Sequence, residues 1–176
     1  MKKIILLFSL LILGSLYSFA QERKDSTGRM FLAYTLGPSY QSFASYSKLT
    51  PAWNISGGVK VGYEKPTRWV GQSINFSLGF QGGAAFKRNT AQTPTAFRCT
   101  VFIEAAYAFP ITIGRIIPFV DFGCIYTKPT GGTFSAIGAT LNLPLKKIEL
   151  TFTPRILYST GFICPELLIG LQHYLW

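Results

Sequence analysis

A strict two-residue alternation marks the stretch Val70–Gln81, VGQSINFSLGFQ. Its apolar positions are Ile74, Phe76, Leu78 and Phe80, and the positions between them are polar or glycine. Successive side chains of a β-strand point to opposite sides, so the pattern predicts a strand with one apolar and one polar face. In a soluble sandwich the apolar face packs inward, whereas in a membrane barrel it meets lipid and the polar face lines the lumen. The choice between these arrangements decides the class of protein.

Seven further segments alternate in the same way, some of them less clearly. The eight expected strands cover 30–41, 53–63, 70–81, 97–109, 116–127, 134–143, 148–159 and 165–176. Strands of roughly ten residues are long enough to cross a bilayer at a tilt. The connections after the first and third strands are longer than those after the fourth and sixth. An even number of strands with long and short connections in alternation is typical of outer-membrane barrels.

The first twenty residues predict export rather than a part of the fold. Two lysines precede an apolar run, and Ser18 and Ala20 form a small-residue cleavage site before Gln21. The run is too short for a transmembrane anchor. We therefore expect a cleaved signal peptide at 1–20, a polar linker at 21–29 and one β-barrel domain at 30–176.

The chain is basic, with a formal net charge of +10 over 176 residues. Such an excess can indicate nucleic acid binding, but an exported protein seldom meets nucleic acid. Anionic lipid or lipopolysaccharide phosphate is the more plausible counter-charge. The alternative is that the excess only keeps the loops solvated.

Charged residues of both signs interrupt the polar faces in the middle of the strands. They are Lys60, Arg98, Glu104, Asp121, Glu149 and Arg155. They favour either a proton or ion path or a salt-bridged plug, and the plug is favoured because charges inside a narrow barrel must be paired. We expect no catalytic, cofactor-binding or metal-binding residues in this set.

Tyrosine and tryptophan gather near the ends of the expected strands, which is typical of the aromatic girdles of membrane barrels. The predicted girdle consists of Trp53, Tyr63, Trp69, Tyr107, Tyr126, Tyr158, Tyr174 and Trp176. The alternative is ordinary core or edge aromatics.

The last expected strand ends in Tyr174 and Trp176. With this ending the chain resembles the small outer-membrane β-barrel family, of the OmpA and OmpX kind. The resemblance implies an all-β fold, an eight-stranded antiparallel up-and-down transmembrane β-barrel, and a terminal aromatic signal at Tyr174 and Trp176 that the barrel-assembly machinery reads. The chain departs from the family pattern at Leu171, where a glycine usually stands, and Gly170 lies one residue away.

Two other functions remain open beside a non-enzymatic structural, adhesion or assembly role in the outer membrane of a Gram-negative bacterium. A lipid-modifying barrel enzyme would need a serine and an acid beside His173, the only histidine, and Glu166 lies on the same expected strand. A soluble lipocalin-like binder in the periplasm would instead turn the apolar faces inward. Neither reading identifies a protein partner.

Three cysteines match no metal motif. Cys99 and Cys124 fall on the apolar faces of consecutive strands, as direct or diagonal neighbours. Two small apolar side chains are favoured there over a disulfide. Cys164 is expected in a loop.

Overall fold

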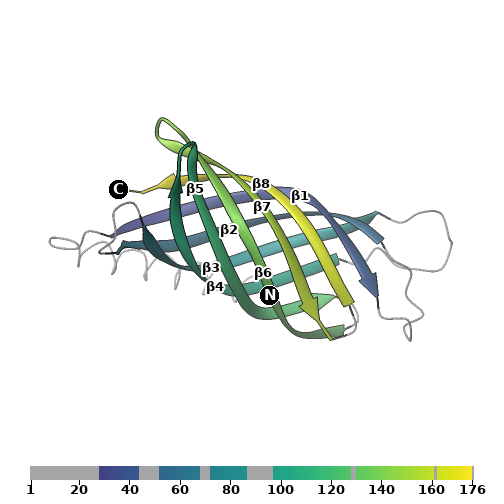
Figure 1. Cartoon of the computed structure of the whole chain (residues 1–176). Coiled ribbons are helices and arrows are strands. Elements are labelled where there is room, and N and C mark those ends of the chain that lie inside the picture. Colours follow the sequence, from purple (N-terminus) through teal and green to yellow (C-terminus); the bar gives the residue numbers. More distant parts are fainter. Residues whose placement is uncertain are drawn as a thin grey trace.

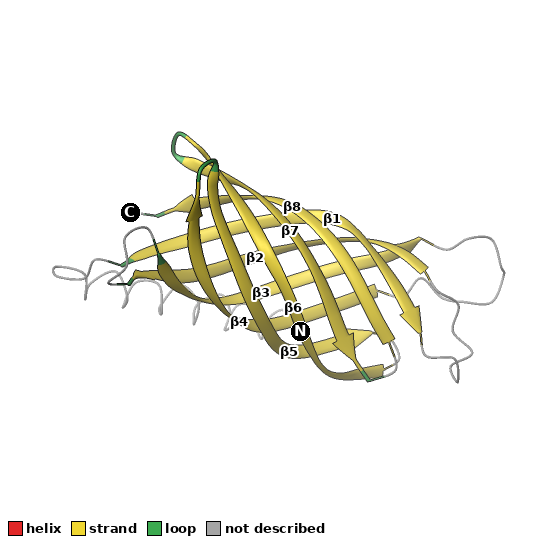
Figure 2. Cartoon of the chain, viewed as in Figure 1, coloured by secondary structure: helices red, strands yellow, loops and turns green. Residues whose placement is uncertain are grey.

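The structure is a computed structural model of the whole chain, and it describes residues 28–43, 52–67, 72–86, 97–127, 130–160 and 162–175. These residues form eight strands joined by turns and loops (Figure 1). The strands are β1 (Arg29–Phe43), β2 (Ala52–Pro66), β3 (Ser73–Phe86), β4 (Phe97–Ile111), β5 (Gly114–Thr127), β6 (Thr130–Leu145), β7 (Ile148–Ser159) and β8 (Phe162–Tyr174). Figure 2 shows strand and turn throughout the described part.

Every strand pairs antiparallel with its neighbours in sequence, and β1 also pairs with β8. Phe31 of β1, for example, lies opposite Gly62 of β2 on one side and Tyr174 of β8 on the other. The sheet is therefore a closed barrel, which leaves no strand edge with unpaired backbone groups. The fold predicted from the sequence is confirmed.

Strand β7 has the 12 residues expected, and the other seven strands are longer than expected, up to 16 residues in β6. Part of the extra length comes from stretches that look like loops in the sequence. Gly131 and Gly132 pair with Tyr126 and Ile125, so only residues 128–129 separate β5 from β6. Cys164 lies in β8 opposite Leu157, and its expected place in a loop was wrong. Backbone pairing extends the hairpins regardless of glycine or proline content.

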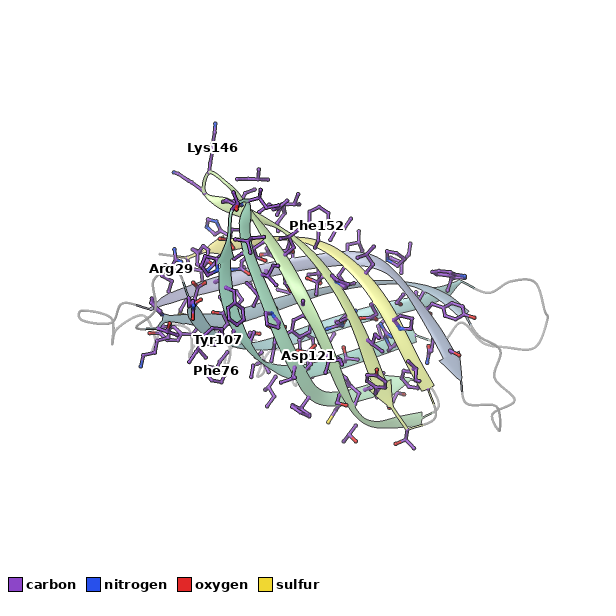
Figure 3. All side chains as sticks on the ribbon, in the orientation of Figure 1. Arg29, Phe76, Tyr107, Asp121, Lys146 and Phe152 are labelled. Atoms are coloured by element: carbon purple, nitrogen blue, oxygen red, sulfur yellow. The ribbon has the colours of Figure 1, made fainter. Side chains whose placement is uncertain are left out.

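One end of the barrel carries the start of β1, the end of β8 and the turns 67–72, 112–113 and 146–147. We call it the terminus end, and the opposite end, with the connections 44–51, 87–96, 128–129 and 160–161, the loop end. Lys146 has a φ of 56° in the two-residue turn between β6 and β7. A two-residue hairpin needs positive φ to match the twist of its strands. Figure 3 shows Lys146 at the tip of this hairpin.

The apolar faces of the strands point outward. Phe76 is 60% exposed and Ile103 is 62% exposed, whereas Asn75 and Ser77 beside Phe76 are buried. Figure 3 shows Phe76 on the outside of the barrel wall. Each strand contributes to this surface, and so large a continuous apolar area is not what a soluble monomer exposes. Strand β3 thus turns its polar side inward and its apolar side outward.

Side chains fill the interior. Two apolar clusters contribute, one around Phe102, Phe134 and Leu157 and the other around Ile117 and Phe119. Interior glycines make room for the large rings: a Cβ on Gly79 would lie 2.2 Å from Cζ of Phe102. An eight-stranded barrel has an interior just wide enough for its side chains. Among the described residues no helix is long and apolar enough to cross a membrane.

Candidate functional site

The six charged residues singled out in the sequence all point into the barrel. Arg98, Glu104, Asp121 and Arg155 are buried, and Lys60 and Glu149 are half-buried. The structure divides them among three groups of contacts. Each group also contains residues outside this predicted set.

The first group joins Lys60 of β2 to Glu104 of β4. The Nζ atom of Lys60 donates to both carboxylate oxygens of Glu104, at 2.7 and 2.9 Å. The hydroxyl of Ser77 on β3, between the two strands, donates to Oε1 of Glu104 at 3.3 Å. Lys60 therefore compensates the charge of Glu104, and both carboxylate oxygens accept hydrogen bonds.

The second group centres on Glu166 of β8. Arg155 of β7 donates from Nε to Oε2 of Glu166 at 2.7 Å and from Nη1 to Oδ2 of Asp121 on β5 at 3.0 Å. Arg98 of β4 donates to Oε1 of Glu166 and, at 2.7 Å, to Oγ of Ser56. Arg155 also donates to Gln81 of β3. Glu166 thus accepts from two buried guanidinium groups.

Cys164 belongs to the same group. It is fully buried, and its Sγ atom lies 2.9 Å from Nη1 of Arg98. Cys99 and Cys124 lie on the outer face and are free. Their registers, Cys99 with Tyr126 and Val101 with Cys124, make them diagonal neighbours.

The third group lies at the terminus end and links two acids through Arg115 of β5. Arg115 donates to Glu64 of β2 at 2.6 Å and to both oxygens of Glu149 of β7, at 2.8 and 2.9 Å. The hydroxyl of Tyr174 donates to Glu64 at 2.6 Å, and Arg115 donates to that hydroxyl. Arg29, nearly half exposed at the rim, adds a second cation for Glu64 at 3.2 Å.

Several of these contacts cross the lumen rather than run along the wall. Arg98–Glu166 joins β4 to β8, and Arg155–Gln81 joins β7 to β3. In an eight-stranded barrel, strands four positions apart stand on opposite sides. The side chains of opposite walls therefore touch, and the interior is bridged and not an open channel at these levels.

Sequence reasoning missed Glu64, Arg115 and Glu166 as members of the network. Glu64 and Arg115 fall in stretches that look like connections, because both lie close to strand ends. Glu166 was considered only beside His173. The two-residue period was the available signal, since Glu166 alternates with Leu167 and shares its face with Gly170 and Gln172.

Seven of the eight predicted girdle residues fall into three sets. Trp53, Tyr126 and Tyr158 are exposed on the outer face near the loop end. Tyr63 and Tyr107 are half-buried towards the terminus end, and Tyr107 donates to Gln72 at 2.6 Å. Trp69 and Trp176 lie outside the described residues, as does the predicted signal peptide.

The position of Tyr174 differs from the predicted one. Tyr174 was expected in the interfacial aromatic girdle, but its hydroxyl contacts Glu64, Arg115 and Glu149 inside the barrel. Side chains two residues apart in a strand point to the same face, and Gln172, two residues before Tyr174, is buried inside the barrel. Buried acids at the terminus end provide the partners that its hydroxyl requires. Its predicted role as an assembly signal stays a prediction.

His173 and Glu166 lie on opposite faces of the wall. They are seven residues apart on β8, an odd separation in a strand, and His173 is exposed beside Ile148 while Glu166 is buried in the lumen. The histidine–acid pair that a barrel hydrolase would need is therefore not formed by these two residues. Within the described ranges, no group of three or more His, Cys, Asp and Glu side chains is arranged to hold a metal ion.

Solved structures of two bacterial proteins have a similar fold. Neisserial surface protein A superposes with a TM-score of 0.62 at 12% identity, over 82% of this chain and 96% of that one. The chain shares the β-barrel fold of this protein. Ail, the attachment invasion locus protein of Yersinia pestis, gives a TM-score of 0.50 at 12% identity, over 84% of this chain and 97% of Ail. Ail has also been solved with the heparin analogue sucrose octasulfate.

No family model and no curated protein sequence matches this chain. At such low identity the solved structures establish the fold alone. The residues of the lumen network must therefore be interpreted from their own contacts.

Proposed function

We propose that this chain is a non-enzymatic integral protein of the bacterial outer membrane, with its terminus end in the periplasm and its loop end at the cell surface. The observation that carries the proposal is the outward apolar belt on a closed barrel. The belt supports insertion in lipid because a bilayer is the solvent that favours exposed Phe76, Ile103 and Phe122. The export predicted from residues 1–20 fits this location.

The bridged interior favours a structural or adhesive role over solute transport. Arg98–Glu166 and Arg155–Gln81 span opposite walls, and apolar side chains fill much of the remaining space. A barrel of this kind holds its loops at a fixed position in the membrane. The fold shared with Ail, named for attachment and invasion, supports presentation of loops to a partner outside the cell.

We infer the binding partners of the protein from the chemistry of its loop-end connections. The connections at the loop end contain Lys48, Lys87, Arg88 and Lys128, outside the described residues. Their charge suits the phosphates of lipopolysaccharide, and the barrel-assembly machinery is the proposed partner during insertion.

Fractionation with a heat-modifiability assay tests the proposal. We expect the protein in the outer-membrane fraction, extracted by detergent and not by buffer. An unheated sample should migrate differently from a boiled one, because the closed barrel resists detergent until heated. Recovery in the soluble periplasm would contradict the membrane location and restore the lipocalin-like alternative. Hydrolysis of lipid by the purified barrel, abolished by His173→Ala, would restore the enzyme alternative.

A further inference from the structure

Glu104 and Asp121 face each other across the β4–β5 pair. They are direct register partners, both on the inner face, and both are buried. Among the described residues, this is the one place where two acids stand opposite each other in neighbouring strands. Like charges in such positions repel each other, and more strongly in a low-dielectric interior than in water.

The groups around Asp121 satisfy only one of its oxygens. Arg155 on β7 donates to Oδ2 at 3.0 Å, whereas Oδ1 has no hydrogen-bond partner. On the β6 side its register partner is Ala136, which offers a methyl group. On the β4 side the partner is the carboxyl group of Glu104. Asp121 is 0% exposed, so bulk water does not solvate the unpartnered oxygen.

Glu104 is the member of the pair with its charge compensated. Lys60 on β2 donates to both of its oxygens, and Ser77 on β3 donates to Oε1. Glu166 on β8 lies on the far side of Arg155 and competes with Asp121 for that guanidinium. Asp121 therefore shares its ion-pair partner Arg155 with Glu166 and faces a second acid, while Lys60, bonded to Glu104, acts on it only at longer range. An ionised Oδ1 in this position would be a buried acceptor without a donor.

We propose that Glu104 and Asp121 form a proton-binding site in which one proton sits on Oδ1 of Asp121 and is donated to the carboxylate of Glu104. A protonated carboxyl group has one O–H donor, and its other oxygen remains free to accept from Arg155. One proton thus removes the repulsion and satisfies the unpartnered atom. The proton is bound inside the barrel, and its binding does not depend on the membrane in which the barrel lies.

Infrared spectroscopy of the full-length barrel, refolded in detergent micelles at neutral pH, tests this directly. A protonated carboxyl group has a carbonyl stretch separate from the carboxylate bands. We expect one such band in the wild type and its loss in Asp121→Asn. Glu149→Gln, a change to a half-buried acid of the terminus-end group, is the matched control and should keep the band.

Absence of the band in the folded wild type overturns the proposal without any variant, and so does a band that survives in Asp121→Asn. A sodium ion between the two carboxylates is the main competitor. Replacing sodium with N-methyl-D-glucamine should leave the spectrum unchanged. A band that appears only after sodium is removed would assign the site to the metal ion.

Stability provides an independent measurement. Asparagine at 121 can donate from Nδ2 to Glu104 and accept from Arg155, so Asp121→Asn should unfold at the same urea concentration as the wild type. Asp121→Ala removes the acceptor for Arg155 and should unfold at a lower concentration. Equal loss of stability in both variants would show that residue 121 must be ionised, which contradicts the proposal.

Discussion

Glu166 accepts hydrogen bonds from Arg98 and Arg155 at a point where all three side chains are buried. Arg98 has no second carboxylate, because its other contacts are Ser56 and Cys164. The second acid that Arg155 contacts is Asp121, through one oxygen. Removing one partner of a buried ion pair leaves the other charge uncompensated, and this is more damaging than replacing the whole pair.

Glu166→Gln should therefore destabilise the barrel by about 3–5 kcal/mol. The measurement is urea unfolding in lipid vesicles, with the folded fraction read from heat modifiability. Glu149→Gln is the matched control, since Glu149 is half-buried and its partner Arg115 keeps Glu64. Equal losses in the two variants would contradict the central place given to Glu166.

At the scale of elements, the strand pattern could be predicted because it is local. The two-residue period of β4, β5 and β7 needs no knowledge of the rest of the chain, and it assigned Glu104, Asp121 and Arg155 to the polar faces correctly. Strand ends were less predictable. Glu64 and Gly131 lie in strands because a neighbouring strand extends far enough to pair with them.

Close packing between elements depends on which interior positions are small. Gly79 of β3 faces the ring of Phe102 on β4, its register partner. Gly79→Ala would force the ring to move and should cost about 1–3 kcal/mol through overpacking. Adding Phe102→Leu should restore part of the loss in urea unfolding. Gly82→Ala is the control, because a Cβ there would meet no atom closer than 3.7 Å; equal effects at both glycines would refute the packing argument.

The outer face of β3 determines how this element meets lipid. Phe76→Arg places a charge on the apolar belt and should cost about 2–4 kcal/mol if Phe76 lies near the bilayer midplane. Ile113→Arg, in the β4–β5 turn at the terminus end, should cost about 0–1 kcal/mol because this position is near the interface. Folding yield in vesicles of defined lipid measures both. A soluble, folded Phe76→Arg barrel would show that the belt does not face lipid.

At the scale of the whole molecule, the lumen contacts could not be read from the sequence. Arg98 and Glu166 are 68 residues apart, and Arg155 and Gln81 are 74 apart. Their meeting depends on barrel closure and on the register of every strand pair between them. The sequence places charges on the correct face but does not say which partner each one finds. Tyr174 shows the same limit, because its inward direction follows from the register of β8 and its partners come from β2 and β5.

The bridges between opposite walls lead to a prediction about conduction. In planar bilayers the wild-type barrel should show no steady conductance, since Arg98–Glu166 and Arg155–Gln81 span the lumen. The double variant Arg98→Ala, Arg155→Ala removes two large side chains and leaves Glu166 and Asp121 without these cations. Any pathway that opens should select cations, because Glu166 then remains along it as a negative charge without its two arginines. Phe76→Ala on the outer face is the control and should stay closed. Steady conductance in the wild type would contradict a bridged interior, and an anion-selective pathway in the double variant would contradict the placement of Glu166 and Asp121 along it.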